Sequence, residues 1–465
     1  MTDTVSSALP HVEPAATETA APALVTRRGR WIDNWDPENT EQWENGGGRD
    51  IARRNLRWSI FAEFLGFVVW QLWSVVVVAL PAAGFELGTG EIFWLISIPS
   101  LVGATLRIPY SFLVPKFGGR NWTIISAALL LIPSIMLAVV VSNPETPFGV
   151  LLLAAALAGF GGGNFASSMS NITFFYPQRE KGWALGLNAA GGNLGASVAQ
   201  FVVPIVITIG AGAALNLPLA GWIWVPLILA AMWGAFRYMD NLSNAKADFA
   251  GSAAALKEPH LWIMSVLYIG TFGSFIGFAS VFPKLIADQF PEFSTIAVGG
   301  ASVGLAFLGA LVGSLARPYG GRLSDRFGGA RITMVAFAAM GMITLAVVQT
   351  LPVANFWLFL GLFLLLFASA GIGNGSTYRM VPIVFALRAS GDETARKRKA
   401  AAALGLISAI GAYGGFLIPQ ALNLSFQATG AYAGAFLGFV AGYALLLAIT
   451  YLVYVRSPRL REHKI

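Results

Sequence analysis

Long apolar stretches alternate with short polar stretches along most of the chain. The apolar stretches are roughly 20 residues long, the length that an α-helix needs to cross about 30 Å of hydrocarbon. They lie at 57–81, 91–114, 122–142, 148–175, 182–209, 219–238, 261–283, 297–318, 331–351, 355–386, 396–425 and 431–455. The pattern therefore predicts an all-α membrane protein with twelve transmembrane helices.

Two polar segments divide the chain. Residues 1–50 are predicted to form a cytosolic N-terminal tail, disordered up to Thr26. Within it, the segment from Trp31 to Trp43 is expected either to rest on the bilayer surface or to act as a flexible linker. No apolar core follows basic residues near Met1, so no signal peptide is predicted. Residues 240–258 form a predicted cytosolic linker between six-helix bundles at 51–239 and 259–465, the second of which ends in a short cytosolic tail.

The two predicted bundles repeat each other in sequence. Arg107-Ile-Pro-Tyr is followed ten residues on by Phe117-Gly-Gly, and Arg317-Pro-Tyr is followed ten residues on by Phe327-Gly-Gly. The copies are 210 residues apart. Parallel duplication of a six-helix unit is a known plan of membrane transporters, in which the substrate site lies between the halves near the middle of the bilayer.

Basic residues predict how the chain is oriented in the membrane. The tail, the linker and alternate loops hold Arg27, Arg28, Arg30, Arg49, Arg53, Arg54, Arg57, Lys116, Arg120, Arg179, Lys181, Arg237, Lys246, Lys257, Arg322, Arg326, Arg331, Arg388, Arg396, Lys397, Arg398, Lys399, Arg456, Arg459, Arg461 and Lys464, whereas the opposite loops hold Lys284. Since basic loops stay in the cytoplasm, both termini are predicted to lie inside the inner membrane. The sequence pI near 9.7 then reflects topology and indicates no nucleic-acid partner.

Composition excludes several other classes of protein. Hydrophobic residues make up 56% of the chain and charged residues 11%, compared with about 25% charged residues in soluble domains. Cysteine is absent, and the three histidines lie outside or at the ends of the apolar stretches, which excludes disulfides and haem ligands within the spans. With neither a nucleophile–base pair nor paired carboxylates in the spans, we expect no enzyme, cofactor or metal.

Away from the ends of the predicted spans, four charged residues fall within them: Glu63, Arg107, Arg317 and Arg379. Each costs about 2.5–3.5 kcal/mol on insertion scales if it lies at the centre of the bilayer. Glu63 and Arg379 have opposite charges, so we expect a cavity ion pair or a coupling role. Arg107 and Arg317 occupy equivalent positions in the two halves and have no carboxylate left to pair with. A bound anion would relieve their repulsion, and planar, forked guanidinium groups suit planar oxyanions.

Four predicted spans are rich in glycine, which lets helices approach closely in lipid. The repeat spacing aligns Gly163-Asn164 in one of them with Gly373-Asn374 in another. Close packing explains the glycines but not the buried amides of Asn164, Asn193 and Asn374, which need polar partners.

Several of these segments resemble known transporter signatures. GRLSDRFGG at 321–329 resembles the cytoplasmic loop signature of the major facilitator superfamily, whereas the first copy at 114–120 lacks the Asp. GGGNFASSMSNITFFYP at 161–177 and GIGNGSTYRMVP at 371–382 resemble the paired signatures of the nitrate/nitrite porter family, and the likeness runs from about Trp31 to near residue 455.

The resemblance implies roles for particular residues. Arg107 and Arg317 would clamp nitrate, and Phe165 and Phe272 would lie above and below its plane. Asn193 and Tyr268 would bond its oxygens, and Ser408 lies in the matching motif of the eleventh span. This sequence departs from many members of the family at Glu63 and Arg379.

The expected function is alternating-access exchange of nitrate for nitrite by a monomer that has no protein or cofactor partner. Three alternatives stay open at this point. The first is proton–nitrate symport, which the titratable Glu63 would support. The second is transport of another small anion, such as formate, by the same fold. The third is an anion channel, which would conduct without exchange.

Overall fold

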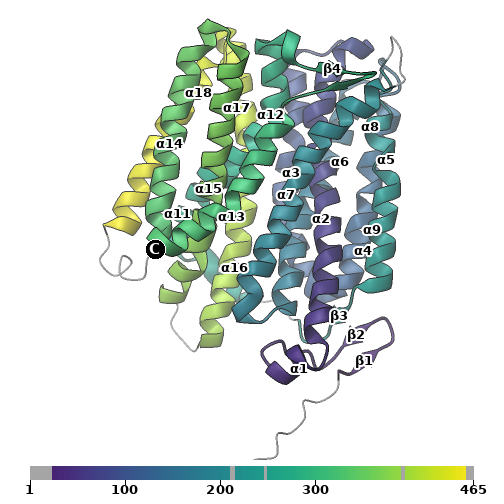
Figure 1. The fold of residues 1–465 in the computed structure, drawn as a ribbon, viewed down its shortest axis with the longest axis vertical. Helices are drawn as coiled ribbons and strands as arrows, with labels where there is room; N and C mark the ends of the chain where they lie inside the picture. The colour runs from purple at the N-terminus through teal and green to yellow at the C-terminus, as the bar shows by residue number, and fades with distance from the viewer. Residues whose placement is uncertain (1–23, 210–214, 246–248, 389–392, 457–465) are drawn as a thin grey trace, which may run out of the picture.

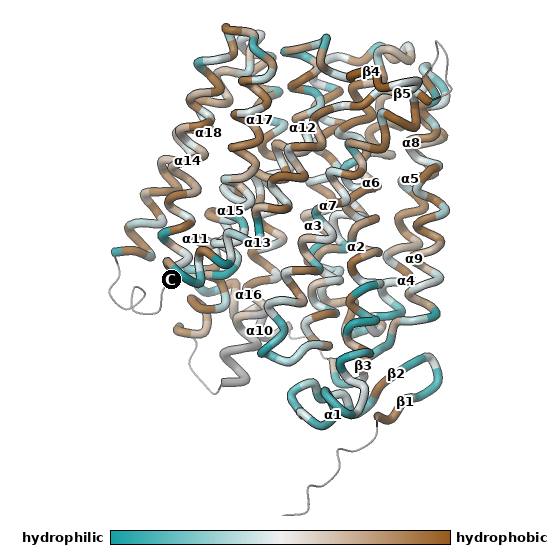
Figure 2. The backbone as a smooth tube through the Cα atoms, in the orientation of Figure 1, coloured by the Kyte–Doolittle hydropathy of each residue, from teal (hydrophilic) through white to brown (hydrophobic). Residues whose placement is uncertain are grey.

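The computed structural model describes residues 24–209, 215–245, 249–388 and 393–456, and it is a bundle of long helices (Figure 1). Residues 1–23, most of the stretch predicted to be disordered, lie outside this range. Hydrophobic residues cover the length of the bundle, and hydrophilic residues gather where α1 and β1–β3 lie (Figure 2). We call that end of the bundle the tail face and the opposite end, where β4 and β5 lie, the far face.

The first bundle holds the helices that follow the tail. Its helices are α2 (Gly48–Ala79), α3 (Thr89–Phe117), α4 (Gly119–Leu129), α5 (Leu131–Val140), α6 (Phe148–Phe175), α7 (Gln178–Thr208), α8 (Leu219–Trp222) and α9 (Val225–Tyr238), with the short turn η1 (Pro81–Ala83).

The second bundle repeats this plan after the short helix α10 (Phe249–Leu256). Its helices are α11 (Pro259–Tyr268), the π-helical turn η2 (Ile269–Gly273), α12 (Ser274–Gln289), α13 (Phe307–Phe327), α14 (Gly329–Thr350), α15 (Phe356–Arg388), α16 (Glu393–Ala412), α17 (Gly414–Thr429), α18 (Ala433–Thr450) and η5 (Tyr451–Val455). The far face adds η3 (Pro291–Phe293), the hairpin β4 (Ile296–Val298) and β5 (Ala301–Val303), and η4 (Leu351–Val353).

The repeat in the sequence is also a repeat in the backbone. Gly118 ends α3 with φ +87°, and Gly328, 210 residues later, ends α13 with φ +97°. Both values lie in the left-handed region that glycine adopts without steric cost, and both turns start the next helix directly. Equivalent glycines therefore make the same tail-face turn in the two bundles.

Eleven helices of the described residues are long and apolar enough to cross a membrane, rather than the predicted twelve. The difference lies at the predicted eighth span, 297–318. Its first residues form the β4–β5 hairpin, and α13 begins only at Phe307, so its last two turns include Arg322, Asp325 and Arg326. These charges lower its mean hydropathy, but α13 still packs lengthwise against α15 and α7 as a member of the bundle.

The N-terminal tail is docked on the first bundle, which corrects the prediction of a surface segment or a flexible linker. Strand β1 (Thr26–Arg27) pairs with β2 (Trp31–Ile32), and β2 pairs with β3 (Asn241–Leu242) from the predicted linker. Helix α1 (Thr40–Glu44) follows β2 along the chain. Trp35 and Trp43 are buried, and their indole N–H groups donate to the carbonyl of Phe174 and to Glu180. The tail thus joins the ends of α6 and α9 at the tail face.

The two bundles are bonded to each other toward the far face. In the described part of the chain, the hydrogen bonds that join them lie between the level of Arg107 and the far face. They link Arg107 with Ser408, Gln71 with Ser280, Gln200 with Ala279, Ser197 with Phe307, Thr105 with Tyr413, Ser97 with Gln420, and Thr208 with Ser302, at 2.6–3.2 Å. The far face is therefore the closed end of the interface between the bundles.

Candidate anion-binding site

Arg107 lies in the middle of α3, buried between the bundles. It is ten residues from the end of the helix at Phe117, or about 15 Å from the tail face at 1.5 Å per residue. Nε donates to the carbonyl of Gly162 at 3.1 Å, and Nη1 donates to the carbonyl and hydroxyl of Ser408 at 3.0 and 3.2 Å. Nη2 has no hydrogen-bond partner, so one fork of the guanidinium is free to bind a ligand.

Arg317 takes the same place in the second bundle. It lies ten residues before α13 ends at Phe327, and its side chain is also buried. The guanidinium carbon is 5.3 Å from the ring centroid of Tyr378, and Nη1 has no hydrogen-bond partner. Each bundle thus supplies one buried arginine at mid-depth with an unsatisfied donor.

A single aromatic ring brings the two arginines close. The centroid of Phe165 on α6 is 4.6 Å from the guanidinium carbon of Arg107 and 5.9 Å from that of Arg317. The two guanidinium carbons are therefore at most about 10.5 Å apart. At that distance and an effective dielectric constant near 20, the repulsion between the two charges is at least about 1.6 kcal/mol.

Phe272 faces Phe165 across the interface between the bundles. The ring centroids are 6.3 Å apart with an angle of 24° between the planes, and the guanidinium carbon of Arg107 is 5.1 Å from the Phe272 centroid. Phe272 comes from the π-helical turn η2, a distortion that often marks functional sites. Atoms in van der Waals contact are about 3.5 Å apart, so a flat ion between the rings needs about 7 Å. The spacing between the ring planes is no greater than the centroid distance, so the rings must move apart to admit one.

Tyr268 extends this aromatic group, and its hydroxyl lacks a partner. Its ring stacks on Phe272 at 5.4 Å and lies 5.8 Å from that of Tyr378. The Tyr268 hydroxyl is buried without a hydrogen bond. Asn193 on α7 is buried as well, and neither atom of its amide has a partner. Buried polar groups are normally satisfied, and those left unpaired point to a ligand or an ordered water.

Carboxylates do not neutralise the two arginines. Among the described residues, no ion pair within 4.0 Å involves Arg107 or Arg317. Glu63 is fully buried on α2 and accepts a hydrogen bond from Asn188 Nδ2 at 2.7 Å. The site therefore keeps an excess of positive charge, as an anion site requires.

The predicted ion pair between Glu63 and Arg379 is wrong. Arg379 lies on the tail-face part of α15 and bonds Asp325 near the end of α13, where the Asp325 side chain is exposed. Asp325 lies on α13, which packs directly against α15, so it is the carboxylate that pairs with Arg379. Arg379 thus links α13 and α15 within the second bundle and does not pair with Glu63 on α2.

The remaining predicted residues lie in helix contacts. A side chain at Gly163 would strike the ring of Tyr110, and one at Gly373 would strike Thr271, so both glycines allow close packing. Asn164 is buried against Gly66, and neither of its amide atoms has a partner. Asn374 is buried, and its carbonyl oxygen lacks a donor.

Sequence reasoning missed Trp70 and Tyr378. The Trp70 ring lies 5.3 Å from the guanidinium carbon of Arg107, and its indole N–H donates to the carbonyl of Pro99. Tyr378 precedes Arg379 in the 371–382 signature, and its position in that motif is the one sequence feature that indicates a place in the site. No pattern in the sequence distinguishes Trp70 from the other apolar residues of its span.

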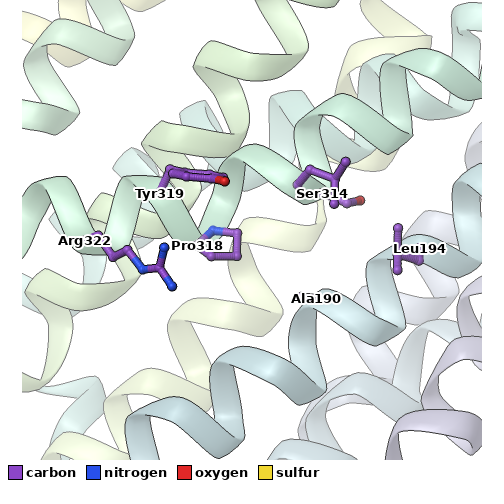
Figure 3. A pocket seen from close by; sticks show the side chains of 7 residues that line it. Ala190, Leu194, Ser314, Pro318, Tyr319 and Arg322 are labelled. Carbon is purple, nitrogen blue, oxygen red and sulfur yellow. The ribbon is translucent and has the colours of Figure 1, made fainter.

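An open groove of about 240 Å³ lies between α7 and α13, and its lining includes the exposed side chains of Leu315 and Tyr319 (Figure 3). Ser314, Pro318 and Arg322 line it from α13, whereas Ala190 and Leu194 line it from α7. These residues lie nearer the tail face than Ser197 and Phe307, where the same two helices are bonded. The groove thus lies on the tail-face side of the hydrogen bond that joins the two helices.

The fold and the site define the class of protein. The chain belongs to the Major Facilitator Superfamily, whose sequence model matches residues 62–419. The fold is shared with a mutant of the nucleoside transporter NupG, whose crystal structure superposes with a TM-score of 0.60 at 11% identity over 86% of this chain and 99% of that one.

Several relatives of higher sequence identity align over most of the chain. The nitrate/nitrite transporter NarU of Escherichia coli (strain K12) is 43% identical over 91% of this chain and 96% of its own length. NarU of Salmonella typhimurium is 44% identical over the same shares of the two chains. The probable nitrate/nitrite antiporter NarK2 of Thermus thermophilus is 37% identical over 93% of this chain and 98% of its own.

Proposed function

We propose that this protein transports nitrate and nitrite across a bacterial inner membrane by alternating access, exchanging one anion for the other. The observation that carries the proposal is the pair Arg107 and Arg317. They come from different bundles, lie within about 10.5 Å of each other beside one aromatic ring, and form no ion pair with a carboxylate of the described residues. The names of the relatives, which include nitrate/nitrite transporters and an antiporter, support the choice of anion.

The basic loops support the proposed orientation. Arg27 and Arg30 lie in the tail, and Arg54, Lys116 and Arg179 lie at the tail-face ends of α2, α3 and α7. By the positive-inside rule these segments face the cytoplasm. Both termini then lie inside the cell. In this orientation the hydrogen bonds that join the bundles toward the far face lie on the outer side of the anion site.

The shape of the site favours a small planar anion. Nitrate is flat enough to enter between Phe165 and Phe272, and its three oxygens can take hydrogen bonds from both guanidinium groups at once. Chloride offers no oxygens, whereas sulfate and phosphate are tetrahedral and carry more charge. Formate is planar too, so it is the competitor that tests the selectivity most severely.

Charge explains why the carrier should exchange anions instead of returning empty. Without an anion, two cations from opposite bundles repel each other, which opposes closure on both sides. A bound anion attracts both arginines and stabilises the occluded arrangement through which the bundles rock. A ligand shifts a conformational equilibrium only by such a difference in affinity between states.

Counterflow in proteoliposomes tests the proposal. Vesicles loaded with nitrite should take up labelled nitrate much faster than empty vesicles, and an excess of nitrate outside should release the nitrite. Formate, chloride and sulfate added outside should compete weakly. Equal uptake into loaded and empty vesicles would overturn exchange, and stronger competition by formate than by nitrite would overturn the choice of anion.

A further inference from the structure

The groove between α7 and α13 is apolar along its walls and basic at one end (Figure 3). Arg322 lies at its tail-face end, and Ser314 and Leu194 lie at the other end. The remaining lining residues are Ala190, Leu315, Pro318 and Tyr319. Its volume of about 240 Å³ is below the roughly 300–1,000 Å³ of pockets that enclose compact ligands, so an open groove of this size suits a chain-like ligand.

The open side of this groove faces lipid. Phe201 on α7 contacts Phe307 on α13 at 4.8 Å between ring centroids, about one turn from the hydrogen bond that joins the two helices, and its side chain is nevertheless 39% exposed. Because the bundles are bonded to each other at that level, this exposure lies on the outside of the protein. Leu187 and Leu194 lie on the same face of α7 as Phe201, at intervals of seven residues. The groove therefore opens on the membrane side of the helices.

The basic end of the groove lies at the level of the membrane boundary. Arg322 is five residues from the end of α13, about 7.5 Å from the tail face at 1.5 Å per residue. Trp183 is exposed at the same depth on α7, five residues after that helix begins. Tryptophan and tyrosine gather where hydrocarbon meets the lipid headgroups, so Trp183 and the exposed Tyr319 place this boundary beside Arg322.

The charge of Arg322 is not cancelled by a carboxylate. Among the described residues it forms no ion pair within 4.0 Å, and Asp325, one turn further along α13, pairs with Arg379. The guanidinium carbon of Arg322 lies 5.8 Å from the ring centroid of Tyr319, a contact that leaves the charge in place. A forked guanidinium binds a phosphate group through two parallel N–H···O bonds.

We propose that this groove binds an anionic phospholipid of the leaflet at the tail face, with its phosphate on Arg322 and one acyl chain between α7 and α13. A zwitterionic phospholipid carries the same phosphate together with a cation that Arg322 repels, so the anionic headgroup binds more tightly. A basic residue near the membrane surface favours an anionic lipid by about fivefold. The proposal concerns the lipid and holds whichever small anion the protein transports.

Native mass spectrometry of the full chain tests the headgroup. The protein is released from detergent with an equimolar mixture of phosphatidylglycerol and phosphatidylcholine of identical acyl chains, at a collision energy that leaves one bound lipid. Wild type should retain phosphatidylglycerol in about fivefold excess, and Arg322→Gln should bring the ratio close to one. Arg331→Gln removes an exposed arginine of α14 that does not line the groove, so this control should keep the wild-type ratio.

Ala190→Leu tests the acyl-chain part of the groove while Arg322 stays in place. The larger side chain fills the groove from α7, so this variant should retain less of either lipid than wild type. Equal melting temperatures of the proteins in detergent without lipid verify that each variant is folded.

Three results would overturn the proposal. A headgroup ratio near one in wild type, or a ratio that Arg322→Gln leaves unchanged, would show that the arginine does not select the lipid. Undiminished retention in Ala190→Leu would place the acyl chain elsewhere. A dimer that retains no lipid would show that a second copy of the chain covers the groove. None of these results bears on the exchange of nitrate for nitrite, which counterflow tests separately.

Discussion

Arg107 and Arg317 are unusual among the charged side chains because their positive charge is met by aromatic rings and backbone carbonyls instead of carboxylates. Phe165, Phe272 and Trp70 lie within 5.3 Å of the Arg107 guanidinium carbon, and Gly162 and Ser408 accept its hydrogen bonds. Cation–π contacts stabilise a cation by about 0.5–2 kcal/mol without cancelling its charge. The site can therefore hold two cations and still attract an anion.

Asn193 offers a test at the scale of one residue. Both atoms of its buried amide lack partners, so replacing it with leucine should remove a cost of about 1–3 kcal/mol from the empty protein. If the amide bonds the anion, the same change should weaken nitrate binding by about tenfold or more, the equivalent of one hydrogen bond to a charged group. Asn193→Leu should thus raise the melting temperature of the empty protein and lower its nitrate affinity.

The control for this prediction is Asn55→Leu. The Asn55 amide is also buried, but it donates to Asp240 and accepts from the Asp240 backbone N–H, so its loss should destabilise the protein and leave nitrate binding unchanged. An Asn193→Leu variant that melts earlier and binds nitrate normally would show that Asn193 is structural.

At the scale of elements, the two bundles hold their tail-face ends in different ways. In the second bundle, Asp325 of α13 bonds Arg379 of α15. The equivalent positions 210 residues earlier are Pro115 and Met169, which cannot form that ion pair. In the first bundle, ion pairs that involve the docked tail hold the tail-face end instead: Asp240 binds both Arg30 of the tail and Arg54 of α2.

The tail dock can be tested through Trp43. Its ring is fully buried, packs edge-on against Tyr176 at 5.6 Å and donates to Glu180. Trp43→Ala should cost about 3–5 kcal/mol of local stability, expose residues 31–45 to protease and hydrogen exchange, and leave the anion site formed. Burial raises the pKa of Tyr176 to about 12, and this pKa should return toward its ordinary value in the variant.

Trp357→Ala is the control, because that tryptophan lies on the far face and is 61% exposed. It should leave the protection of the tail and the titration of Tyr176 as in wild type. Unchanged protection of residues 31–45 in Trp43→Ala would mean that the β1–β2–β3 sheet alone holds the tail.

The sequence predicts some of these features and not others for physical reasons. Apolar length finds most of the helices, and the duplication places Arg107 and Arg317 at matching depths, because equal spacing along equivalent helices brings equal positions together. The sequence does not reveal that Arg379 pairs with Asp325. The apolar pattern places the eighth span at 297–318, whereas α13 begins ten residues later and carries Asp325 near its end, within reach of Arg379. Nor can the sequence dock Trp43, whose partner Glu180 is far away in the sequence.

At the scale of the whole molecule, the structure is one state of a cycle. The bundles are bonded toward the far face through pairs such as Ser97–Gln420 and Ser197–Phe307, and the groove between α7 and α13 lies on the tail-face side of these bonds. Transport requires these far-face contacts to break while the tail face closes. Small residues at the interface between the bundles, such as Gly415 against Ser100, allow the bundles to move against each other at close range.

The absence of native cysteine makes this cycle easy to test. A Ser97→Cys/Gln420→Cys variant joined by a short bifunctional thiol reagent should lose counterflow, because the far face can no longer open. The cross-linked protein should still bind nitrate, which reaches the site from the tail face. Each single-cysteine variant treated in the same way should transport normally, and undiminished counterflow after complete cross-linking would show that these contacts persist throughout transport.

Nitrate calorimetry with Arg107→Lys, Arg317→Lys and the double variant tests the central claim most directly, with Arg326→Lys, an exposed site on the same helix as Arg317, as the control. If one anion bridges both guanidinium groups, the wild-type chain binds a single nitrate, each single change lowers its affinity by about 10- to 150-fold, and the double change costs clearly less than the two combined. Wild-type affinity in either single variant, or losses that simply add, would contradict a site shared by the two halves.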